Sequence, residues 1–326
     1  MGKSIEHPNL GTDFDVCRKL WGSKNYVSIN VPALESGISI LGKRKLDKNG
    51  ELAHLLRAVT CLDLTTLNAD DTPSNVERLC YKALHPIKPD LLLNLGIEAK
   101  EFHTGAVCVY PARIKDCAKT FKCLNADIPI ASVAAGFPSG QYHMETRLSE
   151  IECCVRDGAR EIDVVISRDL VLQGDWEELY EQVKQMKEAC GPEASLKTII
   201  AAGELGSYSN IYKASVACMA AGADFIKTST GKESVNATLP IGFVMTRAIR
   251  DYLFETGYEV GFKPAGGIRT SKDVLMWQSL MKMELGRKWL FPDLFRIGAS
   301  SLLGDIEQSL YQAVYGCYAP KHIFPF

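Results

Sequence analysis

Three lysines lie in strand-like segments of the sequence, and this placement indicates amine chemistry. Lys197, Lys227 and Lys263 occur within apolar runs that end in small, hydroxylated or glycine-containing residues. Burial in an apolar strand disfavours the charged form of a lysine, and a neutral amine can attack a carbonyl carbon. For one such lysine the alternative is a structural side chain whose ammonium group reaches solvent. Three on successive strands favour a chemical role.

Short apolar runs alternate with amphipathic helical segments from Leu52 onward, and this order predicts an α/β fold with a parallel sheet. The predicted strands are 58–64, 105–110, 129–135, 161–167, 196–203, 224–229, 259–265 and 294–300. Helical patterns occur between them, for example at 74–84, 144–158 and 176–191. Eight such units match a closed (β/α)8 TIM barrel, and no dinucleotide-binding Gly-x-Gly-x-x-Gly follows the first strand.

The predicted domain organisation is a single barrel with an addition at its N-terminus. Residues 1–50 are expected to form a helical and loop extension, and residues 51–326 the catalytic barrel. The extension carries a basic run near its end, which is expected to be a solvated surface. This run consists of Lys43, Arg44, Lys45 and Lys48.

Barrel enzymes carry their functional groups at the carboxyl ends of the strands, and several candidates lie there. On the first, second and fourth strands these candidates are Asp63, Thr65, Cys108 and Asp163. Neighbouring strands lie about 4.8 Å apart, so Lys227 and Lys263 should be close if their positions are in register. Two ammonium groups at that distance repel each other, and one is expected to lose its proton near neutral pH. Asp163 would then carry protons and balance charge.

Glycines and serines after the last strands predict a phosphate-binding site. Adjacent glycines let backbone N–H groups approach an anion, while helix N-termini and hydroxyls complete the site. In this fold the loops after the seventh and eighth strands often bind phosphate. A lone glycine pair would indicate only a turn, but here it is combined with Gly-Ala-Ser-Ser on the next strand. The predicted cradle comprises Gly231, Lys232, Gly266, Gly267, Arg269, Gly298, Ser300 and Ser301.

Composition excludes several classes of partner. The formal net charge of −2 gives no reason to expect nucleic acid or a membrane surface, and no apolar run approaches the roughly 18 residues of a membrane span. The N-terminal stretch lacks the apolar core of a signal peptide. Eleven cysteines without a Cys-x-x-Cys pair indicate reduced thiols and a cytoplasmic location. The six histidines show no metal-ligand spacing, so neither a metal nor another cofactor is expected.

Together these motifs resemble the 2-deoxy-D-ribose-5-phosphate aldolase family over about residues 55–305. The segments that carry the resemblance are 63–67, 107–111, 136–140, 161–165, 225–232 and 261–267. The resemblance implies that Lys227 forms a Schiff base, that Lys263 perturbs it and assists proton transfer, and that Asp163 transfers protons through water. It also implies that Lys197 lines the site and that Cys108 lies nearby without being the nucleophile.

The C-terminus departs from the family pattern. Bacterial relatives end in a mobile tail whose terminal tyrosine reaches into the site. Here the chain ends in Lys-His-Ile-Phe-Pro-Phe, and its last tyrosine is Tyr318. A tail-tyrosine role therefore does not carry over to this sequence.

The resemblance implies a class I aldolase that reversibly cleaves 2-deoxy-D-ribose 5-phosphate to D-glyceraldehyde 3-phosphate and acetaldehyde, in deoxyribonucleoside catabolism. Its partners would be this small sugar phosphate and aldehydes, and the expected assembly, if the chain associates, is a homodimer. One alternative is a metal-dependent sugar-phosphate aldolase or epimerase on the same barrel, which needs clustered ligands that the sequence does not supply. A second is a non-catalytic sugar-phosphate binder, which would keep the cradle without the lysines.

Overall fold

The computed structural model describes residues 9–22, 27–43, 46–99, 102–320 and 323–324. Two members of the basic run, Arg44 and Lys45, lie outside these residues, as does most of the C-terminal hexapeptide. The strands are β1 (Leu62–Thr65), β2 (Ala106–Val109), β3 (Ile130–Ala134), β4 (Glu161–Val165), β5 (Ser195–Ile199), β6 (Phe225–Lys227), β7 (Gly261–Lys263) and β8 (Ile297–Ala299).

The eight strands form one parallel barrel, as the sequence predicts. They are hydrogen-bonded in the order β7-β6-β5-β4-β3-β2-β1-β8, so β1 to β7 pair successively along the chain and β8 pairs with β1. Isolated bridges from Phe262 to Phe295 and from Ala265 to Gly298 join the β7 region to the β8 region. These bridges close the barrel, and the prediction of a TIM barrel is confirmed.

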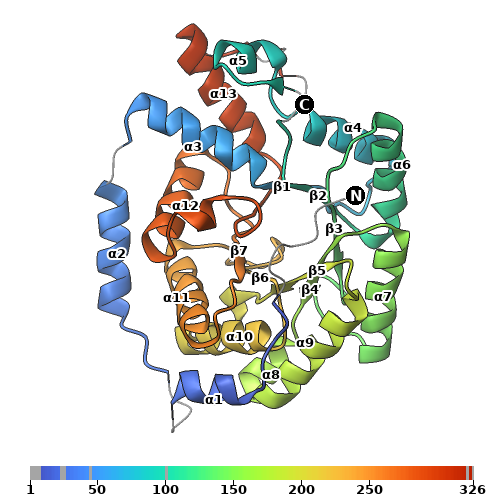
Figure 1. Cartoon of the computed structure of the whole chain (residues 1–326), viewed down its shortest axis with the longest axis vertical. Helices are drawn as coiled ribbons and strands as arrows, with labels where there is room; N and C mark the ends of the chain where they lie inside the picture. Colours follow the sequence, from blue (N-terminus) through green and yellow to red (C-terminus); the bar gives the residue numbers. More distant parts are fainter. Residues whose placement is uncertain (1–8, 23–26, 44–45, 100–101, 321–322, 325–326) are drawn as a thin grey trace.

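Helices surround the strands in Figure 1. They are α1 (Asp15–Trp21), α2 (Val31–Lys43), α3 (Lys48–Thr60), α4 (Pro73–Leu84), α5 (Pro89–Asn94), α6 (Ile114–Leu124), α7 (Met144–Asp157), α8 (Arg168–Gln173), α9 (Trp176–Cys190), α10 (Tyr208–Ala220), α11 (Leu239–Thr256), α12 (Ser271–Glu284) and α13 (Leu302–Tyr315). Short 3₁₀ turns are η2 (Pro111–Arg113), η3 (Ala202–Glu204) and η4 (Arg287–Leu290). Most of the α-helices are amphipathic and place their apolar stripe against the sheet. This arrangement buries the apolar surface of the helix together with that of the sheet.

The first predicted strand begins too early in the sequence. Its residues 58–60 belong to α3, and the strand itself starts at Leu62. Leu55, Ala58 and Val59 are buried on one side of α3, at the i, i+3 and i+4 spacing of a helix. In so short an apolar run, the repeat of apolar residues is the same for a buried helix end and a buried strand. The sequence therefore did not distinguish helix from strand at residues 58–60.

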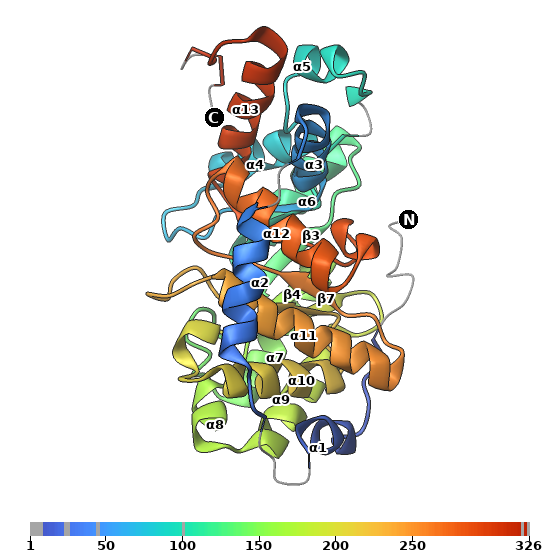
Figure 2. The ribbon, with the colours of Figure 1, turned by 90° about the vertical axis from the view of Figure 1, so that its left-hand side faces the viewer.

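The helices before β1 pack against the outside of the barrel. In Figure 2, α2 runs across α11 and α12, and both contacts are present in the structure. Asn9 is buried and its side-chain amide donates to the carbonyls of Met219 (2.7 Å) and Ala223 (2.9 Å). The described part of the N-terminal segment is therefore fixed to the barrel by hydrogen bonds as well as by apolar contact.

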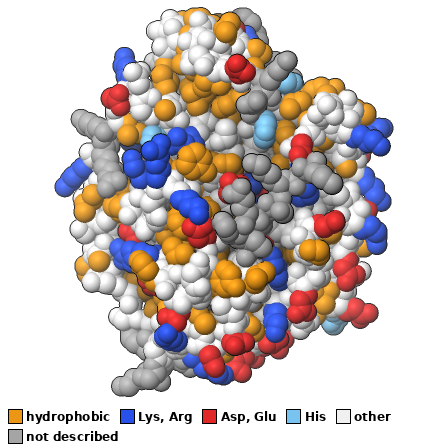
Figure 3. All heavy atoms as spheres, in the orientation of Figure 1, with side chains coloured by type: hydrophobic (Ala, Val, Ile, Leu, Met, Phe, Trp, Pro, Cys, Tyr) orange, Lys and Arg blue, Asp and Glu red, His pale blue; other side chains and the backbone are white. Residues whose placement is uncertain are grey.

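One face of the molecule shows its charged side chains in Figure 3. On the face drawn in Figure 3, basic and acidic side chains are intermingled, in agreement with the small net charge of −2. Within the described ranges, every helix is too short or too polar to cross a lipid bilayer.

Candidate active site

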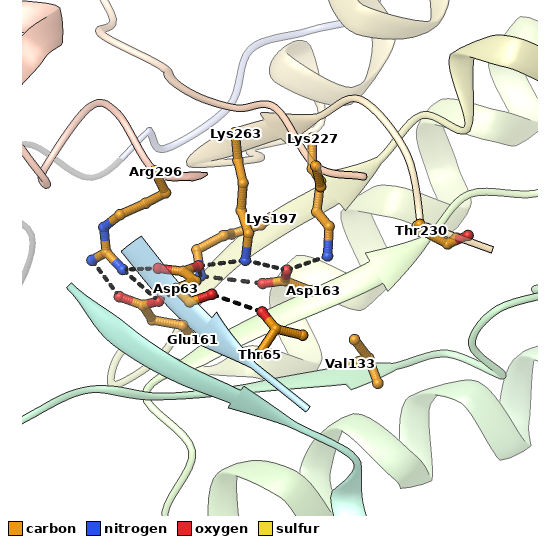
Figure 4. Close-up of polar contacts among 12 residues, drawn as sticks. Asp63, Thr65, Val133, Glu161, Asp163, Lys197, Lys227, Thr230, Lys263 and Arg296 are labelled. Carbon is orange, nitrogen blue, oxygen red and sulfur yellow. Dashed lines mark hydrogen bonds and ion pairs between the residues drawn. The ribbon is translucent and has the colours of Figure 1, made fainter. Parts of the chain in front are cut away.

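Lys227 and Lys263 occupy the same level of the barrel and face the same carboxylate. They are register partners on β6 and β7, which confirms the expected proximity of the two lysines. Each Nζ donates a hydrogen bond of 2.7 Å to Oδ2 of Asp163 (Figure 4). The two ammonium groups are thus no farther apart than twice that distance. A carboxylate oxygen lies between them, which the sequence did not reveal.

Lys197 and Asp63 extend this arrangement toward β1 and β5. Lys197 donates to Oδ1 of Asp163 at 3.1 Å and to Oδ2 of Asp63 at 3.4 Å. Lys263 also donates to Oδ2 of Asp63. Two carboxylates and three lysines therefore form one continuous network, and all of them are buried.

Two further members of the network were missed by the sequence analysis. Arg296, which immediately precedes β8, donates from Nη1 to Asp63 Oδ1 (2.7 Å) and from Nη2 to Glu161 Oε1 (2.7 Å). Glu161 also accepts a hydrogen bond from Lys197. A signal for both existed: Glu161 lies two residues before Asp163, and therefore on the same face of its strand, and Arg296 is a charged residue within an apolar strand segment.

Electrostatics fix the charge of most of these groups. Burial alone would raise the pKa of Asp163, but Lys197, Lys227 and Lys263 outweigh that effect and hold it well below its ordinary value. Asp163 is therefore ionised at neutral pH. Burial would likewise lower the pKa of Lys263, but Asp163 and Asp63 raise it instead. Lys263 is therefore charged at neutral pH.

A cavity of about 250 Å³ opens at the carboxyl ends of the strands, and Lys227 is at its wall. All eight residues predicted for the cradle line it, together with Thr65. These are Thr65, Gly231, Lys232, Gly266, Gly267, Arg269, Gly298, Ser300 and Ser301. The remaining candidates are buried and do not line it: Asp63, Cys108, Asp163, Lys197 and Lys263. Thr65 is tied to the network by a 2.7 Å hydrogen bond from Oγ1 to the carbonyl of Asp63.

The loops after β7 and β8 offer open anion-binding groups. Gly266 and Gly267 have φ values of 80° and 84°, the left-handed conformation that glycine adopts without steric cost. Helix α13 begins just beyond Ser301, whose side chain makes no capping hydrogen bond. The first N–H groups of this helix therefore receive no cap from Ser301, which lines the cavity, and the helix dipole favours an anion at this end.

The loop after β6 differs from the other two, because its anion-binding groups already hold a carboxylate. The backbone N–H groups of Thr230 and Gly231 donate to Glu233 at 3.0 and 3.1 Å. Lys232 donates to the carbonyl of Leu67 at 3.0 Å. Sequence analysis assigned Gly231 and Lys232 to the cradle, and the structure brings both to the cavity. In this conformation, however, the N–H of Gly231 is engaged within its own loop.

Cys108 is buried beside the charge network. Burial raises the pKa of the Cys108 thiol, so this side chain stays protonated beside the network. Among the residues that the structure describes, no group of three or more His, Cys, Asp and Glu side chains is arranged to hold a metal ion. The three buried carboxylates are instead paired with ammonium and guanidinium groups.

The family comparison agrees with this site. A model described as DeoC/LacD family aldolase matches residues 57–303, which include all eight strands. The chain belongs to this aldolase family. The matched segment also contains each member of the charge network and the cavity lining.

Curated relatives match almost the whole chain. The human protein named deoxyribose-phosphate aldolase is 57% identical over 318 residues, covering 97% of this chain and 98% of the relative. The mouse protein of the same name is 58% identical over 315 residues, covering 97% of this chain and 98% of the relative. A solved structure from Toxoplasma gondii ME49 aligns with a TM-score of 0.70 at 23% identity, covering 80% of this chain and 96% of that one. This last likeness supports the fold.

Proposed function

We propose that this protein is a Schiff-base aldolase that reversibly cleaves 2-deoxy-D-ribose 5-phosphate to D-glyceraldehyde 3-phosphate and acetaldehyde. The observation that carries the proposal is the placement of Lys227, which lines the cavity while its amine contacts the ionised Asp163. Relatives at 57–58% identity that carry the name deoxyribose-phosphate aldolase support the choice of substrate.

The reaction begins at the amine of Lys227. The neutral amine adds to C1 of the open-chain sugar to give a carbinolamine, and loss of water leaves a protonated imine. This cation accepts the electron pair of the C2–C3 bond when that bond breaks, which gives a two-carbon enamine. Protonation of the enamine carbon and hydrolysis of the imine release acetaldehyde and restore Lys227.

Two proton transfers accompany the bond cleavage, and Asp163 and Lys263 are assigned to them. The C3 hydroxyl must lose a proton as glyceraldehyde 3-phosphate leaves, and ionised Asp163 is the base next to Lys227. The enamine carbon must gain a proton. Lys263 remains charged and contacts the same oxygen of Asp163, so the two groups can pass a proton between them.

The phosphate group is assigned to the loops after β7 and β8. Gly266, Gly267 and the N-terminus of α13 supply backbone N–H groups, while Ser300 and Ser301 supply hydroxyls. Arg269 lines the same cavity and adds a positive charge. A sugar phosphate bound with its phosphate there would have its aldehyde carbon directed toward Lys227.

We propose that the protein works in the cytoplasm. The described cysteines are all free thiols, which supports a reducing compartment and hence the cytoplasm. We propose a homodimer as the working assembly, residues 1–50 as an extension, and residues 51–326 as the catalytic barrel. The packing of α1 and α2 on the barrel exterior supports an extension that supplies no catalytic group.

Reductive trapping in chelator-treated protein tests the proposed reaction. After exhaustive treatment with EDTA, incubation with acetaldehyde and borohydride is expected to attach one two-carbon group to Lys227, and cleavage activity is expected to persist. Peptide mass spectrometry locates the adduct. Activity that disappears with EDTA and returns with zinc would instead assign the protein to the metal-dependent class.

The phosphate assignment predicts a substrate-selective loss of affinity. Ser301→Asp places a negative charge at the N-terminus of α13, where it opposes phosphate binding. We expect KM for the phosphorylated sugar to rise at least about tenfold, the scale of one lost charge-assisted hydrogen bond, whereas turnover of unphosphorylated deoxyribose changes little. Gly267→Leu should act in the same direction.

The control for Gly267 is a glycine with the same backbone conformation elsewhere. Gly257 has φ 79° at the end of α11 and does not line the cavity. Gly257→Leu introduces similar backbone strain and should leave the KM ratio of the two substrates unchanged. Equal losses on both substrates in Ser301→Asp would show that this loop does not bind the phosphate.

A further inference from the structure

The buried charge network contains an unequal number of cations and anions. Its members, all drawn in Figure 4, are the carboxylates Asp63, Glu161 and Asp163 and the cations Lys197, Lys227, Lys263 and Arg296. Three carboxylates thus face four cationic side chains. If every group were ionised, the barrel interior would hold one uncompensated positive charge. An uncompensated charge is costly in a region of low dielectric, so the loss of one proton balances the network.

The contacts identify the cation that is in excess. Lys227 contacts a single carboxylate, Asp163. Each of the other three cations contacts at least two carboxylates. Lys197 contacts Asp63, Glu161 and Asp163. Lys263 contacts Asp63 and Asp163, and Arg296 contacts Asp63 and Glu161. Lys227 also lines the cavity. It is therefore the lysine with the least compensation and the closest access to substrate.

Arg296 determines which carboxylates the lysines can use. Its guanidinium engages both oxygens of Glu161, at 2.7 and 3.1 Å, and Oδ1 of Asp63 at 2.7 Å. A fourth hydrogen bond, from Nε to the carbonyl of Pro292 at 2.6 Å, holds it in place. Arg296 precedes β8 and so lies at the amino end of the barrel, away from the cavity that opens at the carboxyl ends.

We propose that Arg296 is a positioning residue for the nucleophile: by neutralising Glu161 and sharing Asp63 at the amino end of the barrel, it leaves Lys227 as the surplus cation that gives up its proton. The inference rests on the proposed function, because it takes Lys227 as the Schiff-base lysine. Arg296 itself touches no reacting atom and acts through the charge balance of the network.

The remaining ionisable groups around Lys227 do not alter this balance. Cys108 on β2 keeps its proton, because burial raises the pKa of its thiol. Strand β3 (Ile130–Ala134) contributes no ionisable side chain. At the cavity mouth, Lys232 and Arg269 are exposed to solvent, and Glu233 is bonded to the backbone of its own loop.

The test is the pH dependence of kcat/KM and of reductive trapping at Lys227. In Arg296→Met three cations face three carboxylates, so Lys227 is expected to keep its proton to higher pH. The acid limb of both profiles should move to higher pH by about one unit. At a fixed pH on the acid side, kcat/KM should therefore fall roughly tenfold. Arg296→Lys restores a charge and should return the profile toward that of the unmodified protein.

Glu161→Gln is the second variant of the test, and it should shift the acid limb in the opposite direction. It leaves four cations against two carboxylates, so Lys227 should lose its proton at lower pH and the acid limb should move to lower pH. A role of Arg296 and Glu161 in folding alone would lower activity by the same factor at every pH. Unshifted profiles in folded Arg296→Met or Glu161→Gln protein would overturn the proposal, and Glu161→Gln is decisive if Arg296→Met does not fold.

Arg147 provides the matched control. It is a buried arginine on α7 that donates to the carbonyl of Val165 (2.6 Å) and to Ser167 Oγ (2.8 Å), outside the network. Arg147→Met should lower thermal stability without moving the pH profile. If the unmodified protein forms no adduct at Lys227, the proposed function fails. If the adduct forms but its pH dependence is unchanged in the Arg296 and Glu161 variants, only the present inference fails.

Discussion

Lys227→Leu is expected to abolish both cleavage of 2-deoxy-D-ribose 5-phosphate and reductive trapping. Without this amine there is no imine to accept the electrons of the C2–C3 bond, so the rate should fall to the uncatalysed background. For most enzymes that is a loss of at least about 10⁶-fold. The measurement combines the activity assay with mass spectrometry of borohydride-treated protein.

The same substitution should leave the fold intact. Removing Lys227 leaves three cations, Lys197, Lys263 and Arg296, against three carboxylates, so no buried charge is left uncompensated. Circular dichroism and the denaturation midpoint are therefore expected to stay close to those of the unmodified protein. This separates the loss of the nucleophile from the loss of structure.

Lys115→Leu is the control for non-specific effects of losing a lysine. Lys115 is an exposed residue of α6, and its 3.2 Å ion pair with Asp157 is outside the network. Both activity and trapping should survive in this variant. An adduct on Lys197 or Lys263 in the unmodified protein would contradict the assignment of Lys227 as nucleophile.

The barrel could be predicted from sequence because its pattern is repeated eight times. Each of β1 to β8 overlaps a predicted strand, and the alternation with helices fixes parallel pairing between neighbours. Where the pattern failed, at residues 58–60, a buried helix end preceded a buried strand. Hydrophobicity alone does not distinguish a helix end from a strand here, because an apolar run this short shows neither a helical nor a strand period.

The lysines of the site could be predicted, whereas their partners could not. Lys227 and Lys263 are conspicuous because lysine is rare inside strands, and strand order makes them neighbours. Their bridging by one oxygen of Asp163 depends on side-chain conformations, which no sequence pattern specifies. The engagement of Gly231 by Glu233 depends in the same way on the path of the loop.

Lys263→Leu is expected to keep the nucleophile and change the pH at which it works. Lys263 is 0% exposed, contacts Asp163 and Asp63, and stays charged because those carboxylates raise its pKa. A permanent positive charge so close to Lys227 favours the neutral form of that amine. Without Lys263 the network is balanced with Lys227 protonated, so deprotonation of Lys227 requires a higher pH.

The signature is a rate profile displaced toward alkaline pH, with trapping still located at Lys227. A like charge within about 4–6 Å shifts such equilibria by one to three units, so kcat/KM at pH 7 should fall by about ten- to a thousandfold and recover as the pH rises. Lys263→Arg keeps the charge and should retain a profile near that of the unmodified protein. Loss of activity in Lys263→Leu at every pH, with trapping unchanged, would show instead that the ammonium group of Lys263 is indispensable as the proton donor to the enamine.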